Sequence, residues 1–212
     1  MSYFPFFMNI EGKRGLVVGG GTSALFKIKK LIPFGVNLEV ISQNILEEIK
    51  ELEKQGNILI KYHSFSETDL LPAPQFVIVA LEDKEESHKI AILCRERGIL
   101  VNVVDEPMYC DFYFPSLITR GKCSIGISTS GVSPAIASLL REQIEQIIPE
   151  NMKEILDWLE EKRPELKEKF LEEKIRKQVI RNLYLTCIEK TRVLTQKEYE
   201  EIICERKEDV VR

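Results

Sequence analysis

The chain has 212 residues, with 30 Lys and Arg against 34 Asp and Glu, a formal net charge of −4 and 44% hydrophobic residues. A chain of this length can bury a full hydrophobic core in one or two domains. Its nearly balanced charge provides no field of one sign that would hold a nucleic acid or an anionic membrane surface. We therefore expect no nucleic-acid partner.

The apolar segments are too short to cross a membrane. Residues 3–8 are apolar but have no basic residue before Lys13. No later stretch approaches the roughly 20 apolar residues that a membrane-spanning helix needs. We therefore expect a cytoplasmic protein with no membrane partner.

The five cysteines are odd in number and form no C-x-x-C pair, and neither His63 nor His88 completes a metal-ligand spacing. This pattern argues against a disulfide framework and against a closed zinc site. We expect reduced, mostly buried cysteines, histidines at surface or packing positions, and no protein metal site. The cysteines are Cys94, Cys110, Cys123, Cys187 and Cys204.

Up to residue 150, apolar β-branched runs alternate with helical patterns. This alternation is typical of βαβ units and of a parallel sheet buried on both faces. The helical patterns cover residues 24–32, 45–52 and 88–97, and they end at Pro33, Gly56 and Gly98. The predicted fold class is therefore α/β with a nucleotide-binding layout. The runs are residues 16–18, 38–41, 58–60, 76–80, 99–104 and 123–128.

The composition changes after residue 150, because 30 of the last 62 residues are charged. Apolar residues at helical spacing, among them Met152, Ile155, Leu156 and Leu159, predict amphipathic helices there. Such a stripe cannot stay exposed on a lone helix. We therefore expect this part to pack across a two-fold axis in a homodimer.

The most specific motif is a glycine-rich turn between the first strand and the first helix. It is a G-x-G-x-x-A fingerprint, in which the glycines allow a tight turn and a close approach to a pyrophosphate. The helix that follows offers free N–H groups to the phosphates. A glycine turn without a ligand is the alternative, although three consecutive glycines cost backbone entropy. The predicted cofactor-binding residues are Gly19, Gly20, Gly21, Thr22, Ser23 and Ala24.

The second strand lacks the acidic residue that ends it in NAD-binding relatives of this fold. Glu39 lies too early in the strand, and Ser42 stands at its end, where a hydroxyl can bond the ribose more weakly. No Arg follows that could hold a 2′-phosphate. These residues favour NAD over NADP.

A second group of motifs follows the fifth strand. Asp105 stands at its carboxyl end, where open α/β sheets bind ligands, and an acid that only caps a turn is the alternative. Glu106 is expected to face solvent. Further on, Ser133 and Pro134 predict a helix start behind the Ser- and Thr-rich turn of residues 128–133.

These motifs in this order resemble the siroheme synthase family, which includes precorrin-2 dehydrogenases and sirohydrochlorin ferrochelatases. The resemblance covers most of the chain, from residues 5–7 and 11–13 through the glycine turn with Lys27 to residues 102–105, 114–116, 128–134, 139–141 and 148–149. It implies NAD-dependent oxidation of precorrin-2 to sirohydrochlorin, with Asp105 as the catalytic carboxylate. In bifunctional members it also implies insertion of ferrous iron, and the sequence leaves that activity open.

The resemblance also implies where the ligands bind. Ala80, Leu81 and Asn102 are expected beside the cofactor. Leu81 stands where many members have Thr, and Phe26 where Arg is common. The residues expected to bind the carboxylate-edged macrocycle are Pro115, Ser116, Arg120, Lys122, Ser128, Ser130, Gly131, Ser133 and Arg141. Ordinary turn or solvated positions remain an alternative for the three cations.

Three segments are expected: a Rossmann-like NAD-binding domain in residues 1–115, a strand and helix in residues 116–150 that border the tetrapyrrole site and dimerise, and a helical domain in residues 151–212. We expect no methyltransferase domain in this chain. A non-enzymatic NAD- or tetrapyrrole-binding regulator on the same fold is the main alternative, and a dehydrogenase of another small substrate is a third.

Overall fold

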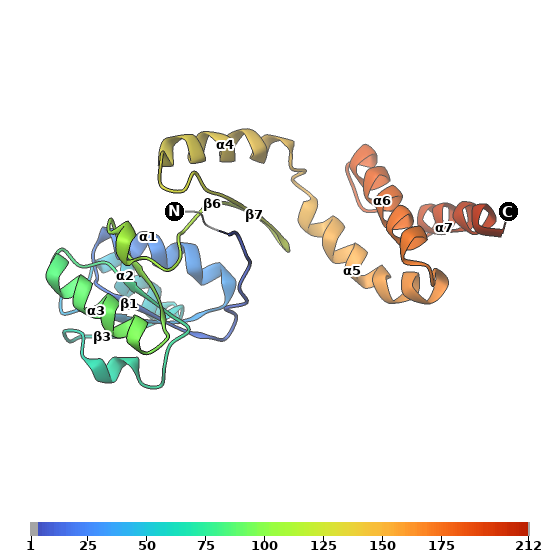
Figure 1. Ribbon diagram of the computed structural model, residues 1–212. Helices are drawn as coiled ribbons and strands as arrows, with labels where there is room; N and C mark the ends of the chain where they lie inside the picture. Colours follow the sequence, from blue (N-terminus) through green and yellow to red (C-terminus); the bar gives the residue numbers. More distant parts are fainter. Residues whose placement is uncertain (1–3, 212) are drawn as a thin grey trace. The chain divides into compact units, whose positions relative to one another are not determined.

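The computed structural model describes residues 4–211, with side chains from Phe4 to Cys204, and divides the chain into two compact units (Figure 1). The first unit is Phe4–Phe114, and the second begins at Pro115. The second unit thus contains both residues 116–150 and the helices that follow them. Among the described residues, no helix combines the length and the apolar character needed to cross a membrane.

The first unit is built on a five-stranded sheet in which all neighbouring strands are parallel. The strand order is β3-β2-β1-β4-β5, so the carboxyl ends of β1 and β4 flank the point where the strand order reverses. Open α/β sheets bind ligands at this point. The predicted α/β class with a Rossmann-like sheet is confirmed. The strands are β1 (Arg14–Val18), β2 (Asn37–Ile41), β3 (Ile58–Lys61), β4 (Phe76–Val79) and β5 (Leu100–Val103), and the short 3-10 turns are η1 (Ile32–Phe34), η2 (Glu67–Leu70) and η3 (Pro107–Tyr109).

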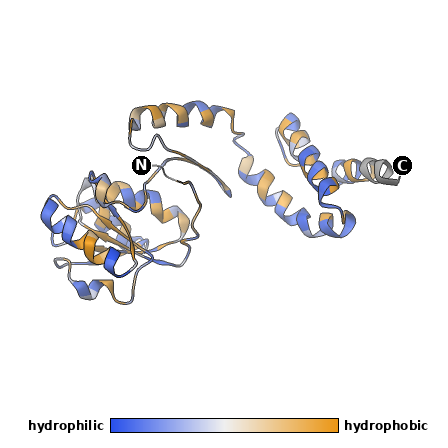
Figure 2. Ribbon diagram, viewed as in Figure 1, coloured by the Kyte–Doolittle hydropathy of each residue, from blue (hydrophilic) through white to orange (hydrophobic). Residues whose placement is uncertain are grey.

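Two apolar layers hold this sheet. Side chains of α1 (Thr22–Leu31) and α2 (Glu47–Lys54) pack on one face, and side chains of α3 (Lys84–Glu96) pack on the other. Strands that are covered on both faces have continuous apolar runs rather than alternation. The sheet is accordingly hydrophobic in Figure 2, whereas the helices carry hydrophobic and hydrophilic sides. Gly56 and Gly98 follow α2 and α3 with positive φ angles of 76° and 68°, which fits their predicted role as helix stops.

The prediction that residues 123–128 belong to the parallel sheet is wrong. Strand β7 (Cys123–Ile127) pairs antiparallel with β6 (Ser116–Arg120) in a separate two-stranded sheet of the second unit. Only Gly121 and Lys122 separate the strands, and Gly121 has a φ of 58°. A two-residue turn with glycine first makes a hairpin, because a parallel connection needs a crossover of a dozen or more residues.

The second unit continues with α4 (Pro134–Ile147), α5 (Met152–Lys169), α6 (Glu173–Lys190) and α7 (Gln196–Val211). The last three helices share one apolar core, in which Ile155 and Leu159 of the predicted stripe on α5 pack with apolar residues of α6 and α7 of the same chain. Association of this part across a two-fold axis stays a prediction. The buried members of the core are Ile155, Leu166, Phe170, Val179, Leu183, Cys187, Leu194, Tyr199 and Ile203.

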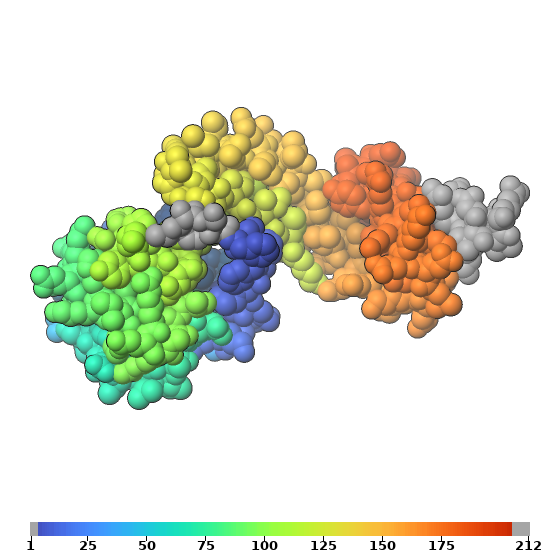
Figure 3. Space-filling model, viewed as in Figure 1, coloured from blue at the N-terminus to red at the C-terminus, as the bar shows by residue number. Residues whose placement is uncertain are grey.

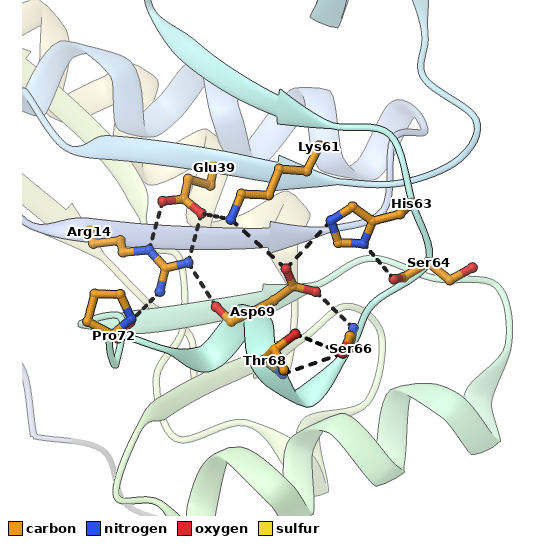
Figure 4. Close-up of polar contacts among 9 residues, drawn as sticks. All are labelled: Arg14, Glu39, Lys61, His63, Ser64, Ser66, Thr68, Asp69 and Pro72. Carbon is orange, nitrogen blue, oxygen red and sulfur yellow. Dashed lines mark hydrogen bonds and ion pairs between the residues drawn. The ribbon is translucent and has the colours of Figure 1, made fainter.

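A network of ion pairs ties the crossover between β3 and β4 to the sheet (Figure 4). Arg14 donates two hydrogen bonds to the carboxylate of Glu39, from Nε at 2.8 Å and from a terminal nitrogen at 2.7 Å. It also donates to the carbonyl oxygens of Asp69 and Pro72. The Nζ of Lys61 lies 2.9 Å from Glu39. Glu39 thus serves in this network, which agrees with the inference that it is not the ribose-binding acid.

Glu39 should stabilise the first unit above pH 4.5. The hydrogen bond from Arg14, followed by that from Lys61, lowers the pKa of Glu39 from 4.5 to about 2 despite its burial. A lowered pKa stabilises the fold above the unfolded value, and the contribution disappears as the pH falls toward 2. Urea unfolding should therefore show Glu39→Gln to be less stable than the parent by about 2–3 kcal/mol at pH 7.

The difference between Glu39→Gln and the parent should disappear near pH 2. Glu47→Gln is a matched control, because Glu47 is 66% exposed and pairs with Lys50 at the surface. An equal loss of stability in both variants at pH 7 would show that the network of Glu39 makes no special contribution.

Candidate functional site

The glycine turn follows β1 directly, and two of its glycines are required by the backbone around them. A Cβ on Gly19 would lie 2.2 Å from the carbonyl oxygen of Ala80, and one on Gly20 would lie 2.2 Å from that of Asn44. Gly19 also has a φ of 118° and donates its N–H to the carbonyl of Ile41 at 2.9 Å. These two glycines therefore join the carboxyl ends of β1, β2 and β4.

Gly21 differs from its two neighbours. A Cβ built there meets no atom within 4 Å, so the space in front of Gly21 is open. Gly21 is the N-cap of α1, and no side chain caps the helix or places an acid in its first turn. The first N–H groups of a helix have no partner within it, and Thr22 and Ser23 are exposed. An open backbone surface at an uncapped helix start fits the diphosphate of a dinucleotide cofactor.

Three other predicted cofactor residues, Ser42, Ala80 and Leu81, already contact neighbouring parts of the first unit. Ser42 follows β2, and its Oγ donates to the carbonyl oxygen of Asn44 at 2.9 Å, so this hydroxyl already shapes the local turn. Ala80 follows β4 beside Gly19, and Leu81 packs against the α3-facing core. Cofactor contacts of these residues stay predictions.

Asn102 lies in β5 with only 4% of its surface exposed. Its Nδ2 donates to the carbonyl oxygen of Phe112 at 2.9 Å, and its Oδ1 has no hydrogen-bond partner among the described residues. The side chain thus ties β5 to the segment that runs beside it. The predicted contact between Asn102 and the cofactor stays a prediction.

Asp105 occupies an unusual backbone position beyond the end of β5. It is exposed and has a φ of 60°, which is the left-handed region that a non-glycine residue adopts at a cost of about 1–2 kcal/mol. The turn is closed by a hydrogen bond from the N–H of Glu106 to the carbonyl of Val103 at 3.3 Å. No side chain from Phe4 to Cys204 forms a hydrogen bond or ion pair with the Asp105 carboxylate. The turn therefore presents an unpaired carboxylate at the carboxyl edge of the sheet.

Two lysines lie near enough to Asp105 to interact with it electrostatically. Lys84 is 75% exposed and pairs with Glu106 at 2.7 Å. Lys27 of α1 is half-buried, with its Nζ 4.4 Å from the ring centroid of Phe114 and with no ion pair among the described residues. Burial, followed by the charge of Lys30, lowers the pKa of Lys27. An unpaired ammonium in this position can accept an anionic group of a ligand.

The expectation that Glu106 faces solvent is wrong. Its side chain is 21% exposed and lies between Lys84 and His88, whose Nε2 is 3.5 Å away. His88 stacks on Tyr109 with ring centroids 3.9 Å apart, so it is a packing histidine. These contacts anchor Glu106 to α3, and the sequence of the turn alone does not reveal them.

The Ser- and Thr-rich loop of the second unit is ordered by its own hydroxyls. Ser128 Oγ accepts the N–H of Ser130 at 3.1 Å, and Ser133 Oγ accepts the N–H of Ile136 at 3.3 Å as the N-cap of α4. The predicted helix start at Ser133 and Pro134 is confirmed. Ser130 and Gly131 have positive φ angles of 53° and 83°. The loop therefore holds a second non-glycine residue in the left-handed region.

The predicted substrate cations are already paired within the second unit. Arg120 donates to Glu145 at 2.8 Å, and Arg141 donates to the other oxygen of the same carboxylate. Lys122 pairs with Asp157 at 3.5 Å and with Glu160. Pro115 and Ser116 lead into and begin β6. Binding of substrate by these residues stays a prediction, and it would require the cations to exchange partners.

Two residues beside Asp105 were missed as site residues by the sequence analysis. Lys27 follows Ser23 by four residues and thus lies on the same side of α1, which is a signal that helical spacing could have given. Cys110, expected only as a small hydrophobic residue, contacts the backbone at both ends of the Asp105 turn. No spacing rule predicts that contact. Among the described residues, no group of three or more His, Cys, Asp or Glu side chains is placed to hold a metal ion.

Comparisons with known proteins identify similar sequences and a similar fold. A model of a putative NAD(P)-binding family matches residues 6–116, and a model of the central region of sirohaem biosynthesis proteins matches residues 120–147. Similar proteins include siroheme synthases of Nitrosococcus oceani, 39% identical over 150 residues, and of Nitrosomonas europaea, 32% identical over 177 residues. These alignments cover 71% and 84% of this chain but 32% and 37% of the relatives.

The chain thus spans about a third of the length of the curated relatives that it matches. A solved structure described as SirC, precorrin-2 dehydrogenase, has the same fold, with a TM-score of 0.67 and 23% identity. The match covers 97% of this chain and 100% of that one. By the family model over residues 6–116, the chain belongs to the putative NAD(P)-binding family, and it is similar in sequence to the siroheme synthases named above.

Proposed function

We propose that the protein oxidises precorrin-2 to sirohydrochlorin with NAD as the acceptor, in the biosynthesis of siroheme. The proposal is supported by the NAD(P)-binding family model, by sequence similarity to siroheme synthases and by similarity in fold to a precorrin-2 dehydrogenase. The observation that carries it is Asp105, a carboxylate without a partner that a left-handed turn holds at the carboxyl edge of the sheet. A protein that only sensed NAD would need the glycine turn but not this strained acid.

The residues of the first unit have distinct roles in this proposal. The N–H groups at the start of α1 and the open backbone at Gly21 bind the diphosphate of NAD. When bound there, NAD would supply the acceptor for the hydride that leaves the reduced bridge of the substrate. Asp105 takes the proton that leaves with it. This step requires the bound substrate to bring that proton within about 3 Å of the carboxylate. Lys27 provides a positive charge near Asp105 for an anionic group of the substrate.

The substrate carries carboxylates around its rim, which need cations and N–H donors. We propose that the loop of residues 128–133 and the cations Arg120, Lys122 and Arg141 bind these carboxylates. A substrate carboxylate would then replace Glu145 as the partner of Arg120 and Arg141. If the protein also inserts ferrous iron, the macrocycle would hold the ion and Asp105 would remove the pyrrole protons.

The purified chain should convert precorrin-2 and NAD to sirohydrochlorin and NADH in equal amounts. Absorption spectra of the tetrapyrrole and the absorbance of NADH would be recorded together in the same reaction. NAD binding without NADH formation would reject the proposal and favour the regulator. NADH formation with another small substrate but not with precorrin-2 would favour the third interpretation.

We further propose that the protein is a homodimer that associates through α4. Ala137 is the only residue of α4 that is buried, whereas Ile136, Leu139 and Ile147 are 52%, 54% and 78% exposed. These residues recur at helical spacing and form an apolar stripe, and the α4 segment lies at the surface in Figure 3. Apolar surface of this kind marks an association site.

Sedimentation velocity at micromolar concentration should show a dimer for the parent and a monomer for Leu139→Glu, because the variant places a charge in the apolar stripe. Leu171→Glu is the control, since Leu171 is 88% exposed and lies outside the stripe. A monomeric parent would contradict the proposed dimer. Dissociation of both variants would show that the interface is not confined to α4.

A further inference from the structure

The sulfur of Cys110 forms the inner support of the turn that carries Asp105. Cys110 Sγ donates to the carbonyl oxygen of Val103 at 3.1 Å and lies 3.4 Å from the carbonyl oxygen of Glu106. It accepts the N–H of Val103 at 3.3 Å and the Nδ2 of Asn102 at 3.4 Å. One sulfur atom thus contacts the residues at both ends of the turn, with Asp105 between them.

This turn needs support from outside its own backbone. A non-glycine residue keeps a φ of 60° only when its surroundings enforce that conformation. The single backbone bond that closes the turn, from the N–H of Glu106 to the carbonyl of Val103, is long at 3.3 Å. On the outer side, Lys84 and His88 hold the side chain of Glu106. On the inner side, Cys110 makes the corresponding contacts with the backbone.

We propose that Cys110 is a positioning residue, which holds the Asp105 turn in its left-handed conformation and so fixes where the carboxylate points. The catalytic consequence rests on the proposed function, in which Asp105 is the base. The support of the turn does not rest on it, because it follows from the four contacts of the sulfur.

The chemistry of the thiol suits this role. Burial raises the pKa of the Cys110 thiol, so the group stays protonated and keeps its hydrogen for a backbone carbonyl. A thiol is a weak donor and a weak acceptor with a large radius, which allows one atom to contact several backbone groups at 3.1–3.4 Å. Cys94 is different, because it belongs to α3 and is fully buried in the apolar layer between this helix and the sheet.

The activity test uses the full chain with alanine and serine at position 110. Cys110→Ala should lower kcat by between about 10- and 100-fold, since misplacing a reacting group by about 1 Å has effects of this size. NAD affinity should be unchanged, because the glycine turn is untouched. Cys110→Ser should have intermediate activity, because its hydroxyl restores a donor on a shorter bond. Cys94→Ala, the control, should unfold more easily but keep the kcat of the parent.

A double-mutant cycle separates positioning from a general structural effect. In the Asp105→Asn background, Cys110→Ala should cause no further loss of kcat, because the group that it positions is already absent. If the two substitutions lowered kcat independently, so that the fold-losses multiplied in the double variant, the proposal would be overturned. Parental kcat in both Cys110→Ala and Cys110→Ser would also overturn it, whereas an inactive parent would count against the proposed function instead.

Amide hydrogen exchange provides a readout that is independent of activity. The N–H of Glu106 should exchange at least about tenfold faster in Cys110→Ala than in the parent, because local opening of the turn becomes easier. In Cys94→Ala, the N–H of Glu106 should exchange at about the same rate as in the parent. Unchanged protection of Glu106 in folded Cys110→Ala and Cys110→Ser would overturn the supporting role of the sulfur, whatever the reaction proves to be.

Discussion

Replacing Asp105 with Asn should lower the turnover of precorrin-2 dehydrogenation by roughly 10²–10⁴-fold, which is the contribution of a positioned acid or base. Asn has nearly the same shape as Asp but does not accept the proton. It also tolerates the left-handed backbone conformation that Asp105 adopts, so the turn should persist. The loss should therefore appear in kcat, with little change in the affinity for NAD.

Stopped-flow measurement of NADH formation at saturating NAD and precorrin-2 would test this expectation. Asp105→Gly is a useful companion, because glycine adopts a φ of 60° without the strain of a side chain. This variant should be as inactive as Asp105→Asn but no less stable toward urea than the parent. A well-folded Asp105→Asn protein with full activity would exclude Asp105 as the base.

Iron insertion, if the protein performs it, allows a second use of Asp105→Asn. A base shared by both reactions predicts parallel losses of dehydrogenase and ferrochelatase activity. A loss of dehydrogenation alone would assign the removal of the pyrrole protons to another group or to solvent. Both activities can be followed in the same preparation by the spectra of sirohydrochlorin and siroheme.

The parallel sheet could be predicted from the sequence because each of its strands is marked by a short run of adjacent apolar residues. Runs such as residues 76–79 are apolar at every position, which fits strands covered on both faces. The hairpin of β6 and β7 was not predicted, because residues 116–120 are only partly buried and lack such a run. Periodicity also cannot distinguish a parallel strand from an antiparallel one. The start of α3 at Lys84 was missed because Asp83, its N-cap, is followed by the polar residues 84–89 rather than by an apolar period.

The candidate site shows the same difference between features that adjacent residues determine and contacts between residues that are far apart in the chain. The positions of Gly21 and Asp105 just beyond β1 and β5 could be predicted, since they depend only on the adjacent residues of the chain. The contacts of Cys110 could not, because they depend on how residues 103–110 fold back on β5. Pairing of Arg120 with Glu145 joins residues 25 positions apart and is equally invisible to spacing rules. The covering of α5 by α6 and α7 also depends on packing.

Replacing Gly21 with Val should abolish detectable NAD binding while the protein stays folded. The structure sharpens this expectation, because a Cβ on Gly19 or Gly20 would collide with the backbone, whereas one on Gly21 meets no protein atom within 4 Å. The φ of −89° at Gly21 is also accessible to valine. Substitution there therefore fills the space proposed for the diphosphate rather than space that the protein itself occupies.

Calorimetric titration of NAD into Gly21→Val, with circular dichroism as the test of folding, would decide where the cofactor binds. Gly21→Ala should retain weak binding, because a methyl group takes up less of the space than an isopropyl group. Lys29→Val is a matched control on the exposed side of α1, and it should bind NAD as the parent does. Parental affinity in folded Gly21→Val would place the cofactor elsewhere, since no rearrangement of the turn lets a diphosphate share the position of a branched side chain against the start of α1.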